Sequence, residues 1–408
     1  MAYLAQALAK KSSGPDLIRD ALIRAGMATS TGKNVTAKTA LQVATVFACC
    51  RVIGEGIAQV PLKLMKETPD GKTRLPAKDH PLYPLLAYKP NPWQTSFEYR
   101  EMIAWHAVLT GTHISFINRS VFGKIYELVP FEPGQVTVKR APDRTLTYDV
   151  RAQDGSTQTF PAEAIWHVRG PSWDGWQGLD AVRLAREAIG LAMATEEATG
   201  ALHKNGVRPS GLYSVEGTLK TDQYEALSEW VNKHNAGAEN TGKAMILDRA
   251  AKWIGTQMTG LDAQTLEMRR FQIEEICRFA RVMPIMVGYS DKATTYASAE
   301  QMFLAHLVHT LAPWYQRLEQ SIDANLLTAA DRAAGLYANF VEEGLLRGSA
   351  VDTKDTILGY VNGGLLTPNE GRAKLDQNPD PDPASDKLRI PANIVGYLPP
   401  AKPKGTTA

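Results

Sequence analysis

Apolar and polar positions repeat with a helical period over residues 262–328, and the pattern predicts a helix, a polar loop and a longer helix. The first helix has two apolar faces beside a narrow charged line, so we expect it to lie wedged between neighbours. Asp262 is placed as its N-cap, and Pro284 ends it, because a proline ring obstructs the preceding helical turn. The two faces comprise Leu266, Ile273, Ile276, Cys277 and Ala280, and Met268, Phe271, Phe279 and Val282.

The charged line of this helix has members three or four positions apart, with mostly alternating sign. Side chains at this spacing lie one above the other on a helix and can form ion pairs. The pattern therefore predicts a surface of paired charges. Its members are Glu267, Arg270, Glu274, Arg278 and Arg281.

The polar loop between the two helices is expected over residues 284–297, and the second helix over residues 298–330. Ser298 with Gln301 has the sequence of a capping box, and Pro313 is expected to kink the helix. The loop contains Ser290, Asp291, Lys292, Thr294 and Thr295. Lys292 and the three hydroxyl groups can form weak contacts with phosphates, and the alternative is that the loop only packs against the same loop of a neighbouring subunit.

The remaining patterns predict an α+β chain without internal repeats. Helices are expected at residues 39–60, after Thr95 or Ser96, and at 181–204. A hairpin is expected around Asp70-Gly71, and alternating strands cover residues 114–168. A small α/β insert follows at residues 206–258, and two short helices at 345–376, the second opened by Thr367 and Pro368. Gly54 and Gly56 indicate close helix packing.

Composition restricts the class of protein. The chain has 408 residues, of which 44% are hydrophobic, and a net charge of +2 from 45 basic and 43 acidic residues. Such balance argues against a protein that grips nucleic acid through bulk charge. The three cysteines do not form a disulfide framework and are expected as buried free thiols. No stretch approaches the roughly 20 apolar residues of a membrane span, and no secretory signal is expected.

Catalytic and metal-binding motifs are missing from the sequence, and no cofactor is expected. His167 with Arg169, and His306 with His309, are interpreted as packed side chains rather than catalytic or metal-ligating ones. Trp173 and Trp176 are expected to fill a corner of the fold or a subunit contact. The pattern therefore predicts a protein that is not an enzyme.

Several segments, in order along the chain, carry a family resemblance. The segments RRFQIEEICRFARVMPIMVG, TTYASAEQ and HTLAPWYQRLEQ resemble portal proteins of tailed double-stranded DNA bacteriophages of the long-tailed siphophage type. The same holds for HPLY with PNPWQT, for AIWHVRGPSWDGWQGLDAVRLAREAIGLA and for LLTPNEGRAKL. The resemblance covers roughly residues 40–378.

The resemblance implies a portal-type fold with a β-rich wing, two stem helices flanking a small α/β clip, a long kinked helix and a helical crown. The domains implied are the wing (39–180), stem helix 1 (181–205), the clip (206–260), stem helix 2 (261–283), the tunnel loop (284–297), the kinked wing helix (298–330) and the crown (331–376). The chain ends, 1–38 and 377–408, are expected as a flexible arm and a disordered tail. A basic arm for nucleic acid is the alternative for residues 1–38.

The resemblance also implies a function: a homo-oligomeric ring of twelve subunits at one capsid vertex, through which double-stranded DNA is packaged and ejected. The implied partners are the large terminase, the major capsid or scaffold protein and a head-tail connector or adaptor, with no membrane. The expected location is the virion, and the host cytoplasm during assembly. In a ring, the charged line would pair with an adjacent subunit or line the channel. The alternatives are a DNA-processing enzyme with an unrecognised site, and a neck or adaptor protein without a channel.

Overall fold

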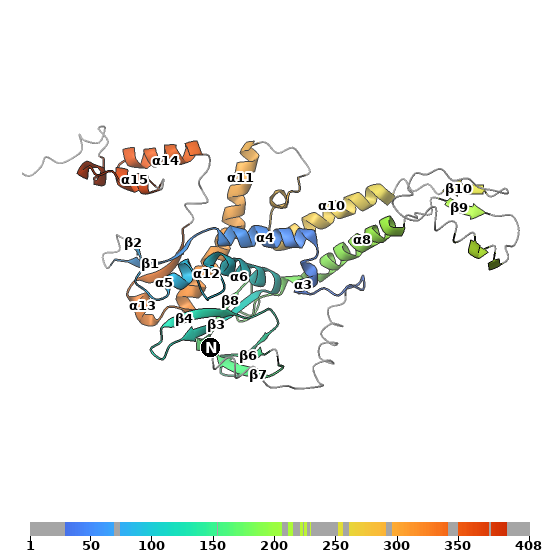
Figure 1. Ribbon diagram of the computed structural model, residues 1–408, viewed down its shortest axis with the longest axis horizontal. Helices are drawn as coiled ribbons and strands as arrows, with labels where there is room; N and C mark the ends of the chain where they lie inside the picture. Colours follow the sequence, from blue (N-terminus) through green and yellow to red (C-terminus); the bar gives the residue numbers. More distant parts are fainter. Residues whose placement is uncertain are drawn as a thin grey trace, which may run out of the picture. The chain divides into compact units, whose positions relative to one another are not determined.

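The computed structural model forms two compact units, Met1–Phe340 and Val341–Ala408 (Figure 1). Each unit is described by itself below, with the labels of Figure 1. The described residues are 29–68, 74–152, 154–205, 211–214, 221–222, 224–226, 229, 252–255, 261–290, 296–341, 350–374 and 377–389.

The helical layer of the first unit begins with α3 (Ala37–Ala40) and α4 (Ala44–Ala58). The single helix predicted for residues 39–60 is therefore wrong, because Val43 has an extended backbone that separates two helices. α4 packs against α6 (Ser96–Thr110), which Thr95 caps with a reciprocal bond to Glu98. The sequence left the start of this helix open between Thr95 and Ser96, and the structure assigns the cap to Thr95.

Close packing of α4 explains its glycines. A Cβ on Gly54 would lie 2.7 Å from Cδ1 of Trp105 on α6, and one on Gly56 would lie 2.8 Å from Cδ2 of Leu311. Real Cβ atoms do not approach other atoms this closely, so both positions need glycine. The predicted role of the two glycines in helix packing is confirmed.

One sheet of the first unit joins segments far apart in the sequence. β1 (Leu62–Glu67) pairs antiparallel with β2 (Arg74–Pro76) on one side and with β11 (Leu336–Phe340) on the other. The predicted hairpin is confirmed, and its turn, Asp70-Gly71, lies outside the described residues. β11 was not predicted. It lies inside the range expected for the crown, but its pairing places residues 336–340 in the first unit.

Two further antiparallel sheets form the β-rich part. Their strand orders are β4-β3-β8 and β5-β6-β7. Ile114, Val138, Tyr148 and Ile165 make the buried core between their strands, and Trp176 packs against this core. Of the six strands, only β7 was not predicted, because its residues are half-buried at best. The bounds are β3 (Thr112–Arg119), β4 (Ile125–Pro130), β5 (Val136–Arg140), β6 (Leu146–Arg151), β7 (Thr157–Pro161) and β8 (Ile165–Arg169).

Two long helices lie side by side after the sheets (Figure 1). They are α8 (Arg186–Asn205) and α10 (Leu261–Ala280). The helix predicted for residues 181–204 is divided, because Ala185 leaves helical geometry between α8 and the short α7 (Ala181–Leu184). α10 begins at Leu261, so Asp262 lies within the helix and its prediction as N-cap is wrong.

The helix predicted at 298–330 contains a π-helical segment shortly before Pro313, where the kink was expected. α11 (Tyr296–His306) continues into the π segment Leu307–Leu311 and then into α12 (Ala312–Asn325). Pro313 lies at the N-terminal end of α12, directly after this segment. The capping box at Ser298 is wrong, since α11 begins two residues earlier.

Shorter elements complete the described chain. The α-helices of this group are α5 (Tyr83–Ala87) and α13 (Ala329–Ala333), with α14 (Ala350–Asn362) and α15 (Pro368–Lys374) in the second unit. Thr367 caps α15 through the N–H of Glu370 at 3.2 Å, as predicted. The remaining elements are 3-10 helices at Ala162–Ala164, Pro284–Val287 and Pro383–Asp386, and the paired strands β9 (Gly211–Ser214) and β10 (Lys252–Gly255).

Residues 29–38 are held against the rest of the first unit. Thr29 and Val35 are buried, and Ser30 binds Glu187 of α8. The flexible arm predicted over residues 1–38 is therefore wrong for its last ten residues, and residues 1–28 lie outside the described chain. Within the described residues, no helix has the length and apolar character that crossing a membrane requires.

Candidate functional site

The inner face of α10 attaches this helix to α4. Ile276 and Cys277 are each 1% exposed, and Sγ of Cys277 lies 3.9 Å from Sγ of Cys49 on α4. All three cysteines are free and buried, as predicted. The contact with Cys277 and burial raise the pKa of Cys49, and burial raises the pKa of Cys50 to about 12. Cys49 and Cys50 are therefore protonated packing groups at neutral pH.

The second apolar face of α10 is only partly covered by its own chain. Val282 is 4% exposed, whereas Met268 is 47% and Phe271 55% exposed. The prediction of a helix buried on two sides therefore fails within one subunit. An aromatic and a thioether side chain on the same exposed helix face are typical of a protein contact surface.

The charged line of α10 is split by the structure. Glu267, Arg270 and Arg278 are exposed on the helix, and Glu274 is half-buried. Glu274 and Arg278 lie one turn apart but form no ion pair within the described chain, so pairing is not realised between these two. Arg281 lies beyond the last helical residue, Ala280.

Arg281 terminates α10 through its backbone. Its φ of 57° is in the left-handed region, which costs a non-glycine residue roughly 1 kcal/mol or more. Its carbonyl accepts a hydrogen bond from Oγ1 of Thr310 at 2.7 Å, and the N–H of Val282 closes the helix on the carbonyl of Cys277. The helix therefore ends before Pro284, which instead starts a 3-10 helix. The end of α10 is thus fixed to the π segment.

The predicted tunnel loop lies mostly outside the described residues. Ser290 is described and exposed. Asp291, Lys292, Thr294 and Thr295 fall outside the described chain. The phosphate contact predicted for Lys292 and the hydroxyl groups of the loop stays a prediction.

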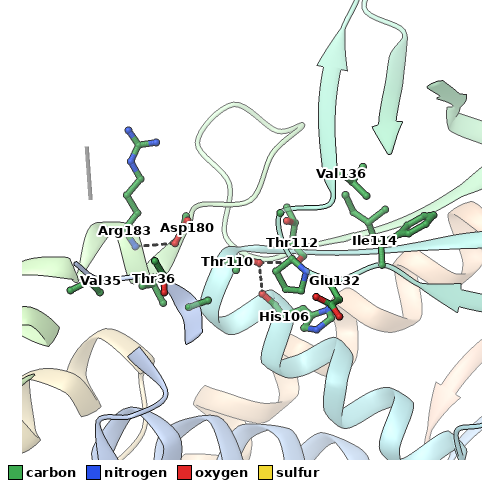
Figure 2. A pocket seen from close by; sticks show the side chains of 15 residues that line it. Val35, Thr36, His106, Thr110, Thr112, Ile114, Glu132, Val136, Asp180 and Arg183 are labelled. Atoms are coloured by element: carbon green, nitrogen blue, oxygen red, sulfur yellow. Dashed lines mark hydrogen bonds between the residues drawn. The ribbon is translucent and has the colours of Figure 1, made fainter. Parts of the chain in front are cut away.

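A hollow of about 320 Å³ lies between α6, α7 and the strands of the β-rich part (Figure 2). Several of its polar groups are bonded within the chain. Oγ1 of Thr110 donates to the carbonyls of His106 and Thr112 at 2.8 and 3.1 Å, and Asp180 accepts from the N–H of Arg183 at 2.9 Å. Glu132 and His106 share the same wall. These hydrogen bonds cap helices and strands, so the polar lining has a structural role.

A chain of buried hydrogen bonds runs from this hollow into the core. Nδ1 of His106 lies 3.1 Å from Nδ1 of His113, whose Nε2 lies 2.8 Å from Oγ of Ser115. Tyr99 extends the chain, with its hydroxyl 2.6 Å from Ser115. Burial lowers the pKa of His106 to about 4, against the charge of Glu132, and holds the pKa of His113 well below its ordinary value. Neutral imidazoles in this network fix α6 against β3.

The structure places His167 and His306 as buried side chains and His309 on the surface. His167 is 5% exposed, and its Nδ1 lies 3.2 Å from the Tyr148 hydroxyl. Burial lowers the pKa of His167 to about 3. His306 is buried, whereas His309 is exposed. Among the described residues, no group of three or more metal-ligating side chains is placed to hold an ion.

The two tryptophans of the 171–178 loop have different roles. Trp176 packs against the core of the sheets, and Trp173 is 91% exposed. The sequence left open whether these residues fill a corner of the fold or form a contact between subunits. The structure assigns the corner to Trp176. Neither the exposure of Trp173 nor the hollow lined by His106 could be read from the sequence, because both depend on how distant segments pack.

The fold and its surfaces define a class: a mixed α and β protein with two paired long helices, small antiparallel sheets and apolar side chains left exposed on helices. The model of the phage portal protein family matches residues 44–376, and the chain belongs to this family. The predicted family and function are confirmed, and a role in a DNA packaging channel is consistent with the family.

Curated relatives agree with the family match. The chain is 28% identical over 356 residues to the portal protein of Enterobacteria phage HK97, covering 87% of this chain and 83% of the relative. It is 26% identical over 381 residues to a probable portal protein of Streptomyces phage phiC31, covering 90% of this chain and 82% of the relative.

Solved structures share the fold. One is from the virion of a native gene transfer agent particle, with a TM-score of 0.59, 23% identity, and coverage of 84% of this chain and 92% of that chain. Another is the crystal structure of an HK97 family phage portal protein from Corynebacterium diphtheriae, with a TM-score of 0.53, 14% identity, and coverage of 78% and 97%. A third, from the neck of the native gene transfer agent particle computed with C12 symmetry, has a TM-score of 0.55, 23% identity, and coverage of 93% and 99%.

Proposed function

We propose that twelve copies of this chain form a ring at one capsid vertex, and that double-stranded DNA passes through its centre during packaging and ejection. The observation that carries the proposal is the family match over residues 44–376. The C12 symmetry used for a neck structure of similar fold supports the number twelve.

The exposed face of α10 supports a repeated contact between copies. Met268 and Phe271 are about half exposed in a single chain, although each belongs to an apolar helix face. Burying apolar area of this kind contributes roughly 25 cal/mol per Å². A closed ring uses two different surfaces of each subunit, head to tail, so this face would contact a different surface on the next copy.

Within the ring, the residues have the following proposed roles. α8 and α10 are the stem helices, residues 206–260 the clip, and residues 284–297 the tunnel loop. The crown would follow β11, since residues 336–340 belong to the first unit. Glu267, Arg270, Glu274, Arg278 and Arg281 would face a neighbouring subunit or the channel.

The proposed partners follow from a position at the vertex. The large terminase and a head-tail connector would dock on the clip, and the major capsid or scaffold protein would contact the wing. The virion location agrees with the neck and virion structures of similar fold, and assembly would take place in the host cytoplasm. The role is structural, with catalysis left to the terminase.

Electron microscopy of the purified full-length protein tests the proposal directly. We expect ring-shaped particles with a central opening and twelvefold averages. Compact particles without an opening, at concentrations that favour oligomers, would rule out the ring. Phe271→Ser should shift particles from rings to smaller species, whereas the exposed Tyr126→Ser on β4 serves as a control for the general loss of a surface aromatic side chain.

A further inference from the structure

An exposed apolar surface lies beside the start of α8. Trp173 is 91%, Leu184 70% and Leu179 39% exposed, and all three line an open hollow of about 730 Å³. Glu187 lines the same hollow. We call it the Trp173 hollow. Exposed apolar side chains gathered around one depression indicate a place where another segment packs.

The loop that presents Trp173 is held by a network of hydrogen bonds. Oδ1 of Asp174 accepts the N–H groups of Trp176 and Gln177, both at 2.9 Å, and Ser172 binds Asp174 and the carbonyl of Gln177. The backbone of the loop is therefore held in place, and Trp173 extends from it with 91% of its surface exposed. A preorganised loop lowers the entropic cost of docking a partner segment.

The described chain begins at the rim of this hollow. The N–H and Oγ of Ser30 donate to Oε2 of Glu187 at 3.1 and 2.7 Å. Thr29 packs on Gly190, where a Cβ would lie 2.6 Å from its Cγ2 atom. Lys33 forms an ion pair with Glu197 on the same helix. Residues 29–33 are thus anchored along α8, and the 28 residues before them start next to the Trp173 hollow.

The sequence of these preceding residues has one apolar face. Leu17, Ile18, Ala21, Leu22 and Ala25 recur at i, i+1, i+4, i+5 and i+8, which is the spacing of one side of a helix. The segment has Pro15 at its start and Gly26 after its end, as helices commonly do. The four residues between Ala25 and Ser30 span at most about 18 Å including both ends, so the segment reaches the hollow easily.

We propose that residues 15–26 dock as an amphipathic helix into the Trp173 hollow of their own subunit, with Leu17, Ile18 and Leu22 against Trp173 and Leu184. The short connection to the anchored residues 29–33 keeps the segment at high effective concentration near the hollow. The docked segment would extend the wing surface with its charged face, Asp16, Arg19, Asp20 and Arg24. This inference does not depend on ring formation.

Disulfide cross-linking in the full-length protein tests the proposal. Leu22→Cys combined with Leu184→Cys is oxidised with copper phenanthroline and analysed by non-reducing electrophoresis and peptide mass spectrometry. The natural cysteines are buried and free, so the introduced thiols are the ones that react. We expect an intrachain disulfide formed at least fivefold faster than in the control pair Asp20→Cys with Leu184→Cys, because position 20 lies on the charged face.

Two outcomes would overturn the proposal. Equal rates for the two pairs would mean that the segment does not present its apolar face to the hollow. An interchain product would assign the hollow to a neighbouring copy or to another partner segment. Both results are independent of whether the particles are rings, so failure here leaves the proposed function untouched.

A glycine pair on α8 tests the role of the anchor. Gly190→Ala should displace Thr29 and reduce intrachain cross-linking severalfold, whereas Gly200→Ala on the same helix meets nothing within 4 Å. Increased hydrogen exchange at residues 29–33 would verify that Gly190→Ala displaces the anchor. If cross-linking is then unchanged, the anchored residues are not what keeps the segment 15–26 near the hollow.

Discussion

Nε2 of Gln272 on α10 donates a hydrogen bond to Oγ1 of Thr195 on α8 at 3.1 Å. Gln272 is only 7% exposed, so its amide depends on this partner. Thr195→Val should lower the free energy of unfolding by about 1–3 kcal/mol, because it leaves a buried donor unpaired. In a double-mutant cycle measured by chemical denaturation, adding Gln272→Leu should recover part of this loss.

Thr199→Val provides the matched control for this cycle. The Thr199 hydroxyl donates to the Thr195 carbonyl at 2.7 Å within α8. Its loss should therefore show no coupling with Gln272→Leu. Additive effects of Thr195→Val and Gln272→Leu would show that the interhelical bond contributes nothing specific to the α8–α10 pair.

Gly54→Ala should destabilise the protein, because the new Cβ would lie 2.7 Å from Cδ1 of Trp105 and would force α4 away from α6. We expect a cost of roughly 1–3 kcal/mol, as for other overpacked cores, seen as a lower midpoint in thermal unfolding. Gly200→Ala is the control: its site is exposed and open, so the better helix propensity of alanine should stabilise α8 by up to about 1 kcal/mol. A midpoint that does not fall in Gly54→Ala would contradict the tight packing.

The elements that the sequence predicted correctly are those with strong local signals. The caps at Thr95 and Thr367 and the strands with alternating polarity depend on nearby residues. The glycines of α4 were recognised from their place in an apolar helix, although the side chains that they pack on, Trp105 and Leu311, lie far away in the sequence. β11 could not be predicted, because its pairing with β1 crosses more than 250 residues, and five residues without a turn signal resemble a loop. The same limit applies to the broken helix at Val43, where tertiary packing overrides a continuous helical pattern.

The candidate surfaces divide in the same way. Periodicity predicted that α10 has two apolar faces, and the structure shows that only one of them is covered by the chain itself, leaving Met268 and Phe271 exposed. The charged line predicted for α10 included Arg281, which lies one residue beyond the end of the helix. This end could not be predicted, because the left-handed backbone of Arg281 has no local sequence signature. Exposure is a property of the folded surface, so the Trp173 hollow could be found only from the structure.

The buried histidines predict a loss of stability on mild acidification. Burial lowers the pKa of His106 to about 4 and the pKa of His167 to about 3, whereas both return to ordinary values near 6.5 on unfolding. The unfolded chain therefore binds more protons below pH 6.5, and the free energy of unfolding should fall as the pH drops from 6.5 to 5. From about one pH unit above 6.5 upward, where the imidazoles are neutral in both states, these two groups should contribute no slope.

His167→Leu is the variant that tests this account. It should make the dependence of stability on pH between 6.5 and 5 shallower, as measured by urea denaturation at each pH. The same change at the exposed His309 should leave the slope of the wild-type protein unaltered. If stability stays constant from pH 7.5 to 5, the histidines do not remain neutral in the folded protein.

Arg278→Glu should disturb ring assembly or DNA passage, since Arg278 is an exposed member of the charged line. The measurements are the fraction of rings in electron micrographs and the yield of packaged genomes. Arg269→Glu is the matched control. Arg269 is also exposed on α10 but lies nine residues earlier, about two and a half turns away and therefore on the opposite side of the helix. If both variants give the same fraction of rings and the same yield of packaged genomes, the charged line does not face a neighbouring subunit or the channel.

Lys292→Glu tests the proposed contact between the tunnel loop and DNA. Lys292 lies outside the described residues, and its role comes from its place in the loop between α10 and α11. In a ring of twelve, the substitution replaces twelve positive charges near the phosphates with negative ones, so packaging and retention of DNA should fall. The defect should be largest at low salt, where charges are least screened.

Lys292→Arg distinguishes a phosphate contact from packing between neighbouring loops. A guanidinium group keeps the positive charge and binds phosphate, so Lys292→Arg should package DNA nearly as well as the wild type if charge is what matters. If the loop instead packs only against the loop of the next subunit, both variants should change ring stability without a salt-dependent packaging defect. Normal packaging and retention in Lys292→Glu would show that this side chain does not act on DNA.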